Sequence, residues 1–140
     1  MKKSNIYDCL TIELPLIKKE NGLLATAENK KHVPFDIQRI YYLYDIPAGE
    51  SRGGHAHKKL RQLIISASGS FDVVIFDGNI KRIITLNRPN YGLYIAPGIW
   101  RELENFSSGS VCLVLASKEY DESDYIRNYD DFLLYKLNNL

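Results

Sequence analysis

Two histidines one residue apart are the side chains of this sequence best suited to chemistry. They form the segment His55-Ala56-His57, which follows Gly53 and Gly54. On a β-strand this spacing points both imidazoles to one face, about 7 Å apart along the chain, and the glycines let the backbone approach a ligand closely. An imidazole with a pKa of about 6.5 takes up and returns a proton near neutral pH. The pair therefore predicts proton transfer at a carbon next to a carbonyl, that is, enolisation.

Enolisation also needs a hydrogen-bond donor for the developing enolate oxygen. The tyrosines and arginines that we consider for this role are Tyr41, Tyr42, Tyr44, Arg52 and Arg101. If 39–45 is a strand, Arg39 and Tyr41 face one side while Tyr42 and Tyr44 face the other. The sequence leaves open which of these two sides faces inward.

Short apolar segments, separated by Gly, Pro, Asn and Asp, must position these side chains. They return at intervals of about 8 to 12 residues, which is typical of an all-β sandwich or barrel. Between two of them, Asp77-Gly78-Asn79 signals a tight hairpin whose turn needs a positive φ. The expected strands cover residues 23–28, 39–45, 62–66, 71–76, 81–86, 92–95 and 111–116.

The tail 120–140 interleaves acidic and apolar residues. We expect a short helix over 132–137 that covers one end of the sheet, with Asp130 and Asp131 near its positive N-terminal pole. We interpret this tail as an amphipathic cover on the core and assign it no chemical role.

Length and composition favour one folded domain over residues 1–140, with 45% hydrophobic and 25% charged residues. A net charge of +1 provides no field that would hold nucleic acid or an anionic membrane. Cys9 and Cys112 are too few for a disulfide framework. No apolar run approaches the roughly 20 residues of a membrane span, and no apolar signal core follows Met1. We therefore expect a reduced, cytoplasmic protein.

The histidine segment resembles the first motif of the cupin superfamily. Gly49, His55, His57 and Gly69 fit its spacing, and Gln62 stands at the position of its glutamate. A second, eroded cupin motif covers 92–101 and has Arg101 at its histidine position. In metal-binding cupins these positions ligate a divalent ion. A neutral amide and a permanent cation disfavour a metal here, so we expect neither metal nor cofactor.

Several segments taken together resemble the sugar 3,4-ketoisomerases of deoxysugar biosynthesis. The likeness runs from about Leu23 to Phe132 and rests on residues 39–42, 52–59, 92–94, 100 and 124–127. It implies a cupin, or jelly-roll, barrel with a short C-terminal helical segment, and a homodimer with exchanged strands. It also implies a dTDP-linked keto sugar as substrate, dTDP-4-oxo-6-deoxy-D-glucose, whose carbonyl moves from C4 to C3. The product of such enzymes leads to 3-amino-3,6-dideoxy sugars of lipopolysaccharide or another surface glycan.

The resemblance also implies roles for single residues. The Arg-Gly-x-His spelling matches the related 3,5-epimerases and favours His55 as the carbon base, with His57 as the acid that serves the oxygens. Arg39 and Arg52 are the expected partners of the diphosphate, because a planar guanidinium suits phosphate. Thymine is expected to stack on a tyrosine or on Trp100.

Two positions depart from relatives of this wider group. Asn21 stands where many of them have an arginine, and Arg101 replaces a histidine of the branch that inverts C4 to give the galacto product. Because arginine is a poor proton donor, we favour the gluco configuration at C4.

Three other functions remain open to the sequence. They are 3,5-epimerisation of a dTDP-sugar, a metal-dependent cupin oxygenase, and a non-catalytic module that binds a sugar nucleotide. The His55–His57 pair favours the ketoisomerase over the epimerase, and two intact histidines argue against a mere binding module.

Overall fold

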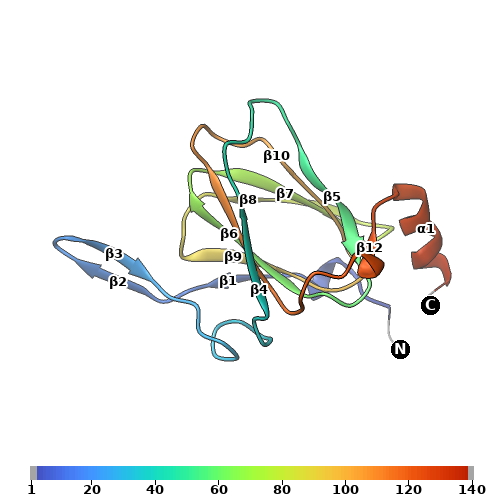
Figure 1. Ribbon diagram of the computed structural model, residues 1–140, viewed down its shortest axis with the longest axis horizontal. Coiled ribbons are helices and arrows are strands. Elements are labelled where there is room, and N and C mark those ends of the chain that lie inside the picture. Colours follow the sequence, from blue (N-terminus) through green and yellow to red (C-terminus); the bar gives the residue numbers. More distant parts are fainter. Residues whose placement is uncertain (1–2, 139–140) are drawn as a thin grey trace.

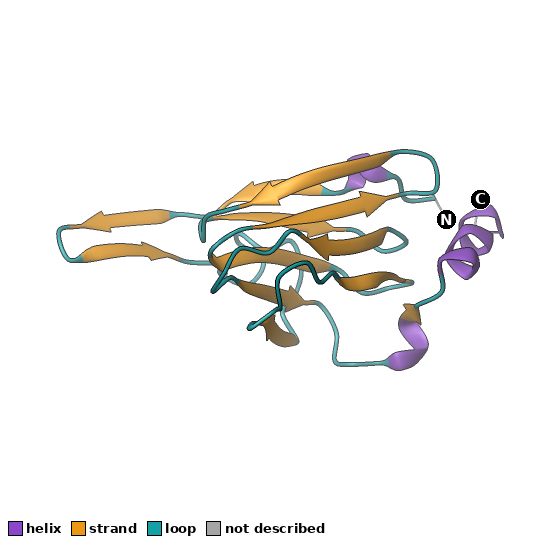
Figure 2. Ribbon diagram, turned by 90° about the horizontal axis from the view of Figure 1, so that it is seen from above, coloured by secondary structure: helices purple, strands orange, loops and turns teal. Residues whose placement is uncertain are grey.

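Two five-stranded antiparallel sheets face each other in the computed structural model, which describes residues 3–138 (Figures 1 and 2). The first sheet has the order β1 (Leu10–Glu13), β9 (Tyr91–Ile95), β6 (Gln62–Ser68), β11 (Val111–Ala116) and β4 (Arg39–Leu43). The second has the order β12 (Tyr125–Ile126), β5 (Arg52–His57), β10 (Trp100–Glu104), β7 (Phe71–Phe76) and β8 (Lys81–Leu86). The expected all-β class is confirmed, although the two sheets do not close into one barrel.

The remaining elements lie outside these two sheets. They are the hairpin of β2 (Leu16–Lys19) and β3 (Gly22–Ala25), the 3-10 turns η1 (Ile6–Asp8) and η2 (Glu122–Asp124), and the helix α1 (Tyr129–Asn138). No helix among residues 3–138 is long and apolar enough to span a membrane.

Every strand expected from the sequence has a counterpart, and three have the expected bounds: β7, β8 and β11. The expected strand 23–28 is shifted to Gly22–Ala25, and 39–45 ends at Leu43. The sequence analysis missed β1, β2, β10 and β12, and it considered β5 only as the strand that the histidine spacing would suit. β10 was missed because its inward residues include the charged Arg101, so the usual apolar alternation is hidden.

The interior between the sheets is filled by apolar side chains that alternate along the strands. Its largest fully buried members include Ile64 of β6, Phe71 and Ile75 of β7, Leu93 of β9 and Leu103 of β10. The free thiols of Cys9 and Cys112 are buried in the same cluster. The buried polar residues His55, Gln62 and Arg101 lie on strands of the same two sheets.

The hairpin between β7 and β8 is confirmed, with Phe76 paired to Lys81. Gly78 has a φ of +98°, which a side chain would strain. One oxygen of the Asp77 carboxylate accepts from the backbone N–H groups of Asn79 and Ile80 at 2.8 and 2.7 Å. The other oxygen accepts from the backbone N–H of Ile6 at 2.8 Å.

The C-terminal helix α1 covers one end of the second sheet, as expected, but it begins at Tyr129 and not at Phe132. The Phe132 side chain is fully buried against Ala56, Trp100 and Ile126. Lys136, only 4% exposed, donates from Nζ to the backbone oxygens of Ser4 and Gly98, both at 2.8 Å. The helix is therefore attached to the N-terminal segment and to the turn before β10.

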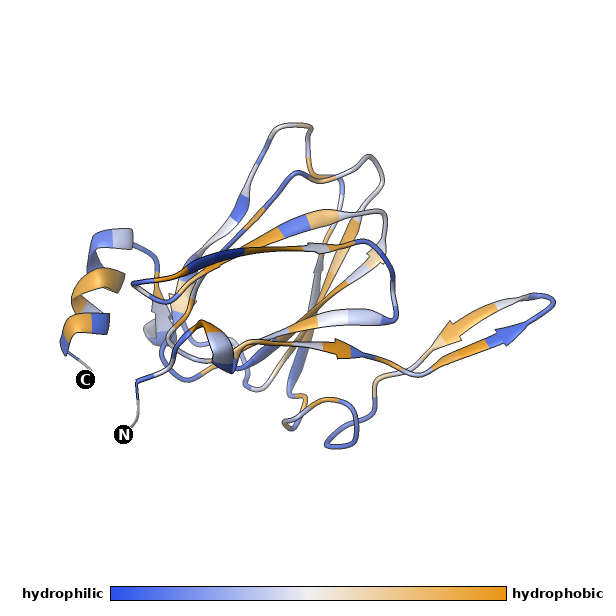
Figure 3. Ribbon diagram, turned by 180° about the vertical axis from the view of Figure 1, so that it is seen from behind, coloured by the Kyte–Doolittle hydropathy of each residue, from blue (hydrophilic) through white to orange (hydrophobic). Residues whose placement is uncertain are grey.

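The β2–β3 hairpin projects away from the sandwich on the side opposite α1 (Figures 1 and 3). Both of its strands contain hydrophobic residues, whose ribbon is orange in Figure 3, and the side chains of the four large ones are exposed: Leu16, Ile17, Leu23 and Leu24. Asn21 lies in the turn at its tip.

Candidate active site

The two histidines lie side by side between the sheets. His55 and His57 are on β5, their ring centroids are 4.8 Å apart, and the rings meet edge to face. They are only 8% and 5% exposed. The spacing therefore places both imidazoles on one buried face, as the sequence predicted.

A β-bulge in β5 places Arg52 on the same face as the histidines. His55 pairs with Arg101 of β10, whereas Arg52 pairs with Leu103, so β5 has one extra residue between the two pairs. Gly53, with a φ of +71°, provides this irregularity, and a Cβ on it would lie 3.0 Å from Nη1 of Arg101. In a regular strand, Arg52 would face away from His55, three positions later.

Arg101 and Tyr41 connect the histidines to the first sheet. Nη2 of Arg101 lies 3.1 Å from Nε2 of His55 and donates to the Tyr41 hydroxyl at 2.9 Å. Because a guanidinium only donates, Nε2 of His55 is the acceptor and carries no proton. The structure thus brings His55, Arg101 and Tyr41 into one chain of hydrogen bonds.

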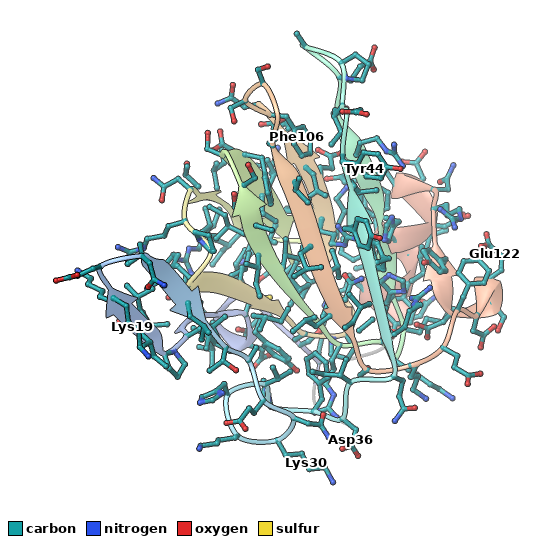
Figure 4. All side chains as sticks on the ribbon, turned by 60° about the vertical axis from the view of Figure 1, so that its left-hand side comes forward. Lys19, Lys30, Asp36, Tyr44, Phe106 and Glu122 are labelled. Carbon is teal, nitrogen blue, oxygen red and sulfur yellow. The ribbon has the colours of Figure 1, made fainter. Side chains whose placement is uncertain are left out.

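The inward face of β4 carries Arg39 and Tyr41. Tyr42 and Tyr44 lie on the other face, 58% and 61% exposed, with ring centroids 6.1 Å apart (Figure 4 labels Tyr44). The expectation that Tyr42 or Tyr44 could stabilise an enolate is therefore wrong for the site of this chain, because strand alternation turns both away from the histidines.

Two residues that the sequence analysis did not select complete the site. Tyr125 of β12 is paired to His57, and its ring centroid lies 5.0 Å from that of His55 and 4.3 Å from that of His57. Oδ2 of the buried Asp124 lies 3.3 Å from Nδ1 of His57. The Asp124 carboxylate also accepts from the backbone N–H groups of Lys59 and Leu60, at 2.8 and 3.1 Å.

The expected binding residues are distributed unevenly. Arg39 is half-buried next to this site, with its guanidinium 5.3 Å from the Tyr41 ring and 5.6 Å from the Tyr120 ring. Trp100 faces the opposite side of the second sheet, where it packs on Tyr129 and Phe132 and is only 6% exposed. The expected stacking of thymine on Trp100 is therefore wrong, since the residue next to Arg101 in a strand must face away from it.

Asn21 is also remote from the histidines of its own chain. It lies on the projecting hairpin, whereas η2 and β12 lie on the opposite side of the molecule, as the positions of Lys19 and Glu122 in Figure 4 show. Within one chain, therefore, Asn21 and the two histidines are not brought together.

Both imidazoles are held in their neutral form. Burial, followed by the positive charges of Arg101, His57 and Arg127, lowers the pKa of His55 to about 2. Burial and Arg101 also lower the pKa of His57, to about 4, and these two effects outweigh the attraction of Asp124, which acts in the opposite direction. At neutral pH the site therefore contains two unprotonated bases beside a permanent cation.

These lowered pKa values predict that the protein loses stability in mild acid. Well above pH 6.5 neither state binds a proton at these histidines, so they contribute no pH dependence. Below pH 6.5 the imidazoles bind protons in the unfolded state. In the folded state His57 binds a proton only near pH 4 and His55 only near pH 2. Each should lower the free energy of unfolding by about 1.4 kcal/mol per pH unit.

Urea unfolding between pH 5 and 6.5 measures this slope above the main titration range of unfolded carboxylates. The double variant His55→Asn, His57→Asn should show a much flatter dependence. An equal slope in both proteins would contradict the assignment of buried, neutral histidines.

The residues at the cupin metal positions do not fit a divalent ion. Gln62 offers a neutral amide, and the guanidinium of Arg101 lies 3.1 Å from the His55 nitrogen that would have to bind the ion. Within residues 3–138, no three His, Cys, Asp or Glu side chains form a group suited to a metal. We therefore derive no step through a metal.

Fold and site together define a small cupin with a histidine and arginine site between its sheets. The family model FdtA, described as WxcM-like, C-terminal, matches residues 7–137. The chain belongs to this FdtA family.

Several proteins similar to this chain are named as sugar 3,4-ketoisomerases or oxoisomerases. The TDP-4-oxo-6-deoxy-alpha-D-glucose-3,4-oxoisomerase of Aneurinibacillus thermoaerophilus is 48% identical over 124 residues, 89% of each chain. The sugar 3,4-ketoisomerase QdtA of Thermoanaerobacterium thermosaccharolyticum, solved in complex with TDP, is 41% identical with a TM-score of 0.94 over 97% of this chain and 99% of that one. The TDP-quinovose 3,4-ketoisomerase WlaRB of Campylobacter jejuni is 49% identical with a TM-score of 0.88 over 92% and 99%.

Proposed function

We propose that this protein is a sugar-nucleotide 3,4-ketoisomerase that converts dTDP-4-oxo-6-deoxy-D-glucose into dTDP-3-oxo-6-deoxy-D-glucose. The observation that carries the proposal is the chain from the unprotonated Nε2 of His55 through Arg101 to the Tyr41 hydroxyl. It joins a base, a cation and a hydroxyl in one buried space, which is what movement of a ketone between adjacent carbons requires. Relatives named as 3,4-ketoisomerases or oxoisomerases support the same reaction.

The reaction is an internal transfer of hydrogen that needs no external oxidant. Nε2 of His55 takes the C3 proton, the C–H electrons form the C3–C4 double bond, and the C4 oxygen becomes an enolate that takes a proton. The C3 hydroxyl then loses its proton, C3 becomes the ketone, and C4 takes the proton from His55. We assign the proton exchanges at the two oxygens to His57 and Tyr41, while Arg101 stabilises the enolate charge.

Positive side chains near the histidines suit the nucleotide diphosphate. Arg52 lies on the histidine face of β5 because of the bulge, and Arg39 is half-buried beside the Tyr41 ring. We assign the diphosphate to these two arginines. We retain the gluco configuration at C4, because Arg101 cannot deliver a proton to the other sugar face, and WlaRB is named for TDP-quinovose.

The apolar hairpin supports a homodimer with exchanged strands. Leu16, Ile17, Leu23 and Leu24 are 39 to 69% exposed on a hairpin that leaves its own sandwich. A second copy would bury them. In such a dimer, Asn21 would act at the site of the partner and not at its own.

We extend the proposal to the pathway and the compartment of the reaction. A 3-oxo sugar is the substrate that an aminotransferase needs to make a 3-amino-3,6-dideoxy sugar for lipopolysaccharide or another surface glycan. We place the enzyme in the cytoplasm, where the free thiols of Cys9 and Cys112 would stay reduced.

One incubation tests the proposal. Purified protein is mixed with dTDP-4-oxo-6-deoxy-D-glucose in deuterated water and followed by NMR. We expect a C3 carbonyl in the product and deuterium at C3 but not at C5 of the remaining substrate; a parallel reaction in ordinary water should give the large H4–H5 coupling of the gluco product. Exchange at both C3 and C5 would indicate a 3,5-epimerase, binding without turnover would indicate a binding module, and an axial C4 hydroxyl would overturn the gluco assignment.

A further inference from the structure

Gln62 is a buried polar residue that the mechanism above does not use. It lies on β6 and is only 1% exposed, between the two sheets. Its Nε2 donates to the Tyr41 hydroxyl oxygen at 2.9 Å. Its Oε1 has no hydrogen-bond partner among residues 3–138. The side chain therefore makes one directed contact, and that contact is with the hydroxyl that faces Arg101.

The Tyr41 oxygen accepts two hydrogen bonds at once. The second donor is Nη2 of Arg101, also at 2.9 Å. Neither the guanidinium nor the amide nitrogen of Gln62 has a free lone pair, so neither can accept the proton of the hydroxyl. With both acceptor directions of the oxygen occupied, its proton must point to a third group.

We propose that Gln62 is a positioning residue that holds the Tyr41 hydroxyl with its proton directed at a substrate oxygen. This inference rests on the proposed function. Gln62 does not contact the reacting carbons itself; it acts by occupying one acceptor direction of Tyr41. The hydroxyl is thereby kept as a proton donor towards the sugar.

A glutamate, the usual cupin residue, would reverse this arrangement. A carboxylate only accepts, so it would take the hydrogen bond of Tyr41 and turn the proton away from the substrate. It would also attract the Arg101 guanidinium, whose Nε and Nη1 have no hydrogen-bond partner and which makes no ion pair within residues 3–138. The neutral amide therefore keeps both Tyr41 and Arg101 available.

The experiment compares Gln62→Leu, Gln62→Glu, Tyr41→Phe and the double variant Tyr41→Phe, Gln62→Leu with the wild type. The kcat of Gln62→Leu should fall about tenfold, the effect of one neutral hydrogen bond, and that of Gln62→Glu at least as much. The dissociation constant of TDP should stay within about twofold. In the Tyr41→Phe background, Gln62→Leu should cause no further loss, because the hydroxyl through which it acts is already absent.

Ser66→Ala is the matched control. Ser66 is a buried polar residue of the same strand, but its hydroxyl bonds to the backbone oxygens of Ser68 and Gly69 and not to the site. Its kcat should equal that of the wild type. If either folded Gln62 variant keeps wild-type kcat, or if Gln62→Leu lowers kcat equally with and without the Tyr41 hydroxyl, the inference is overturned while the proposed function stands. An inactive wild type would overturn the proposed function and the inference with it.

Discussion

Replacement of His55 by asparagine is expected to lower kcat by about 10²- to 10⁴-fold, the range that a positioned general base contributes. Asparagine keeps an oxygen that can accept the hydrogen bond of Arg101, 3.1 Å from Nε2 in the native site. It cannot take up a proton near neutral pH. The expected loss is therefore one of chemistry, with the dissociation constant of TDP changed little. Turnover measured by NMR, together with calorimetric titration of TDP, separates the two effects.

His32 provides the matched control for this substitution. It is a half-buried histidine whose Nδ1 accepts from the backbone N–H of Glu28 at 3.0 Å, in a loop outside the site. His32→Asn should keep wild-type kcat. His57→Asn should also be impaired, since His57 serves the oxygens. Near-normal turnover in both His55→Asn and His57→Asn would show that these histidines do not have the assigned roles.

Asp124→Asn is the second substitution expected to have a large effect. The Asp124 carboxylate accepts two backbone N–H groups at 2.8 and 3.1 Å and lies 3.3 Å from Nδ1 of His57. Asparagine has only one acceptor oxygen. Its amide NH2 group would therefore face either a backbone N–H or the imidazole of His57, and one of the present interactions would be lost. We expect a loss of about 1 to 3 kcal/mol in the free energy of unfolding. We expect kcat to fall about a hundredfold, the lower end of acid–base contributions.

The control is Asp131→Asn, an exposed aspartate in the first turn of α1. It removes the same charge from the same tail and should change kcat less than twofold. Urea unfolding and NMR turnover measure both quantities. If Asp124→Asn keeps wild-type kcat at a temperature where it is fully folded, Asp124 only stabilises the loop before β6 and does not position His57.

The sequence predicted the part of the site that depends on local spacing. The alternation of a strand is enough to place His55 and His57 on one face, and strand-forming residues defined most of both sheets. Alternation also separates Tyr41 from Tyr42, but it does not say which one faces inward. That choice is made by the pairing of β4 with β11, where Tyr41 is opposite the buried Val114.

Asp124 shows why the rest of the site was not predicted. In the sequence it is one of several acids in an amphipathic tail, and nothing local distinguishes it from Asp121 or Asp130. Its role arises because β12 pairs with β5, which brings the tail back to His57 across more than sixty residues of chain. The one available signal was the segment 124–127, which contributed to the family resemblance but was not considered as part of the site.

The single extra residue in β5 makes the direction of Arg52 independent of the direction of the two imidazoles. Along a regular strand, side chains alternate between the two faces of the sheet. The bulge at Gly53 shifts this alternation by one position between Arg52 and His55. A regular β5 of the same length would turn Arg52 to the opposite face, while the two imidazoles would keep their direction. Deleting one glycine would instead leave Arg52 two positions before His55 and opposite Leu103, so both side chains would stay on one face.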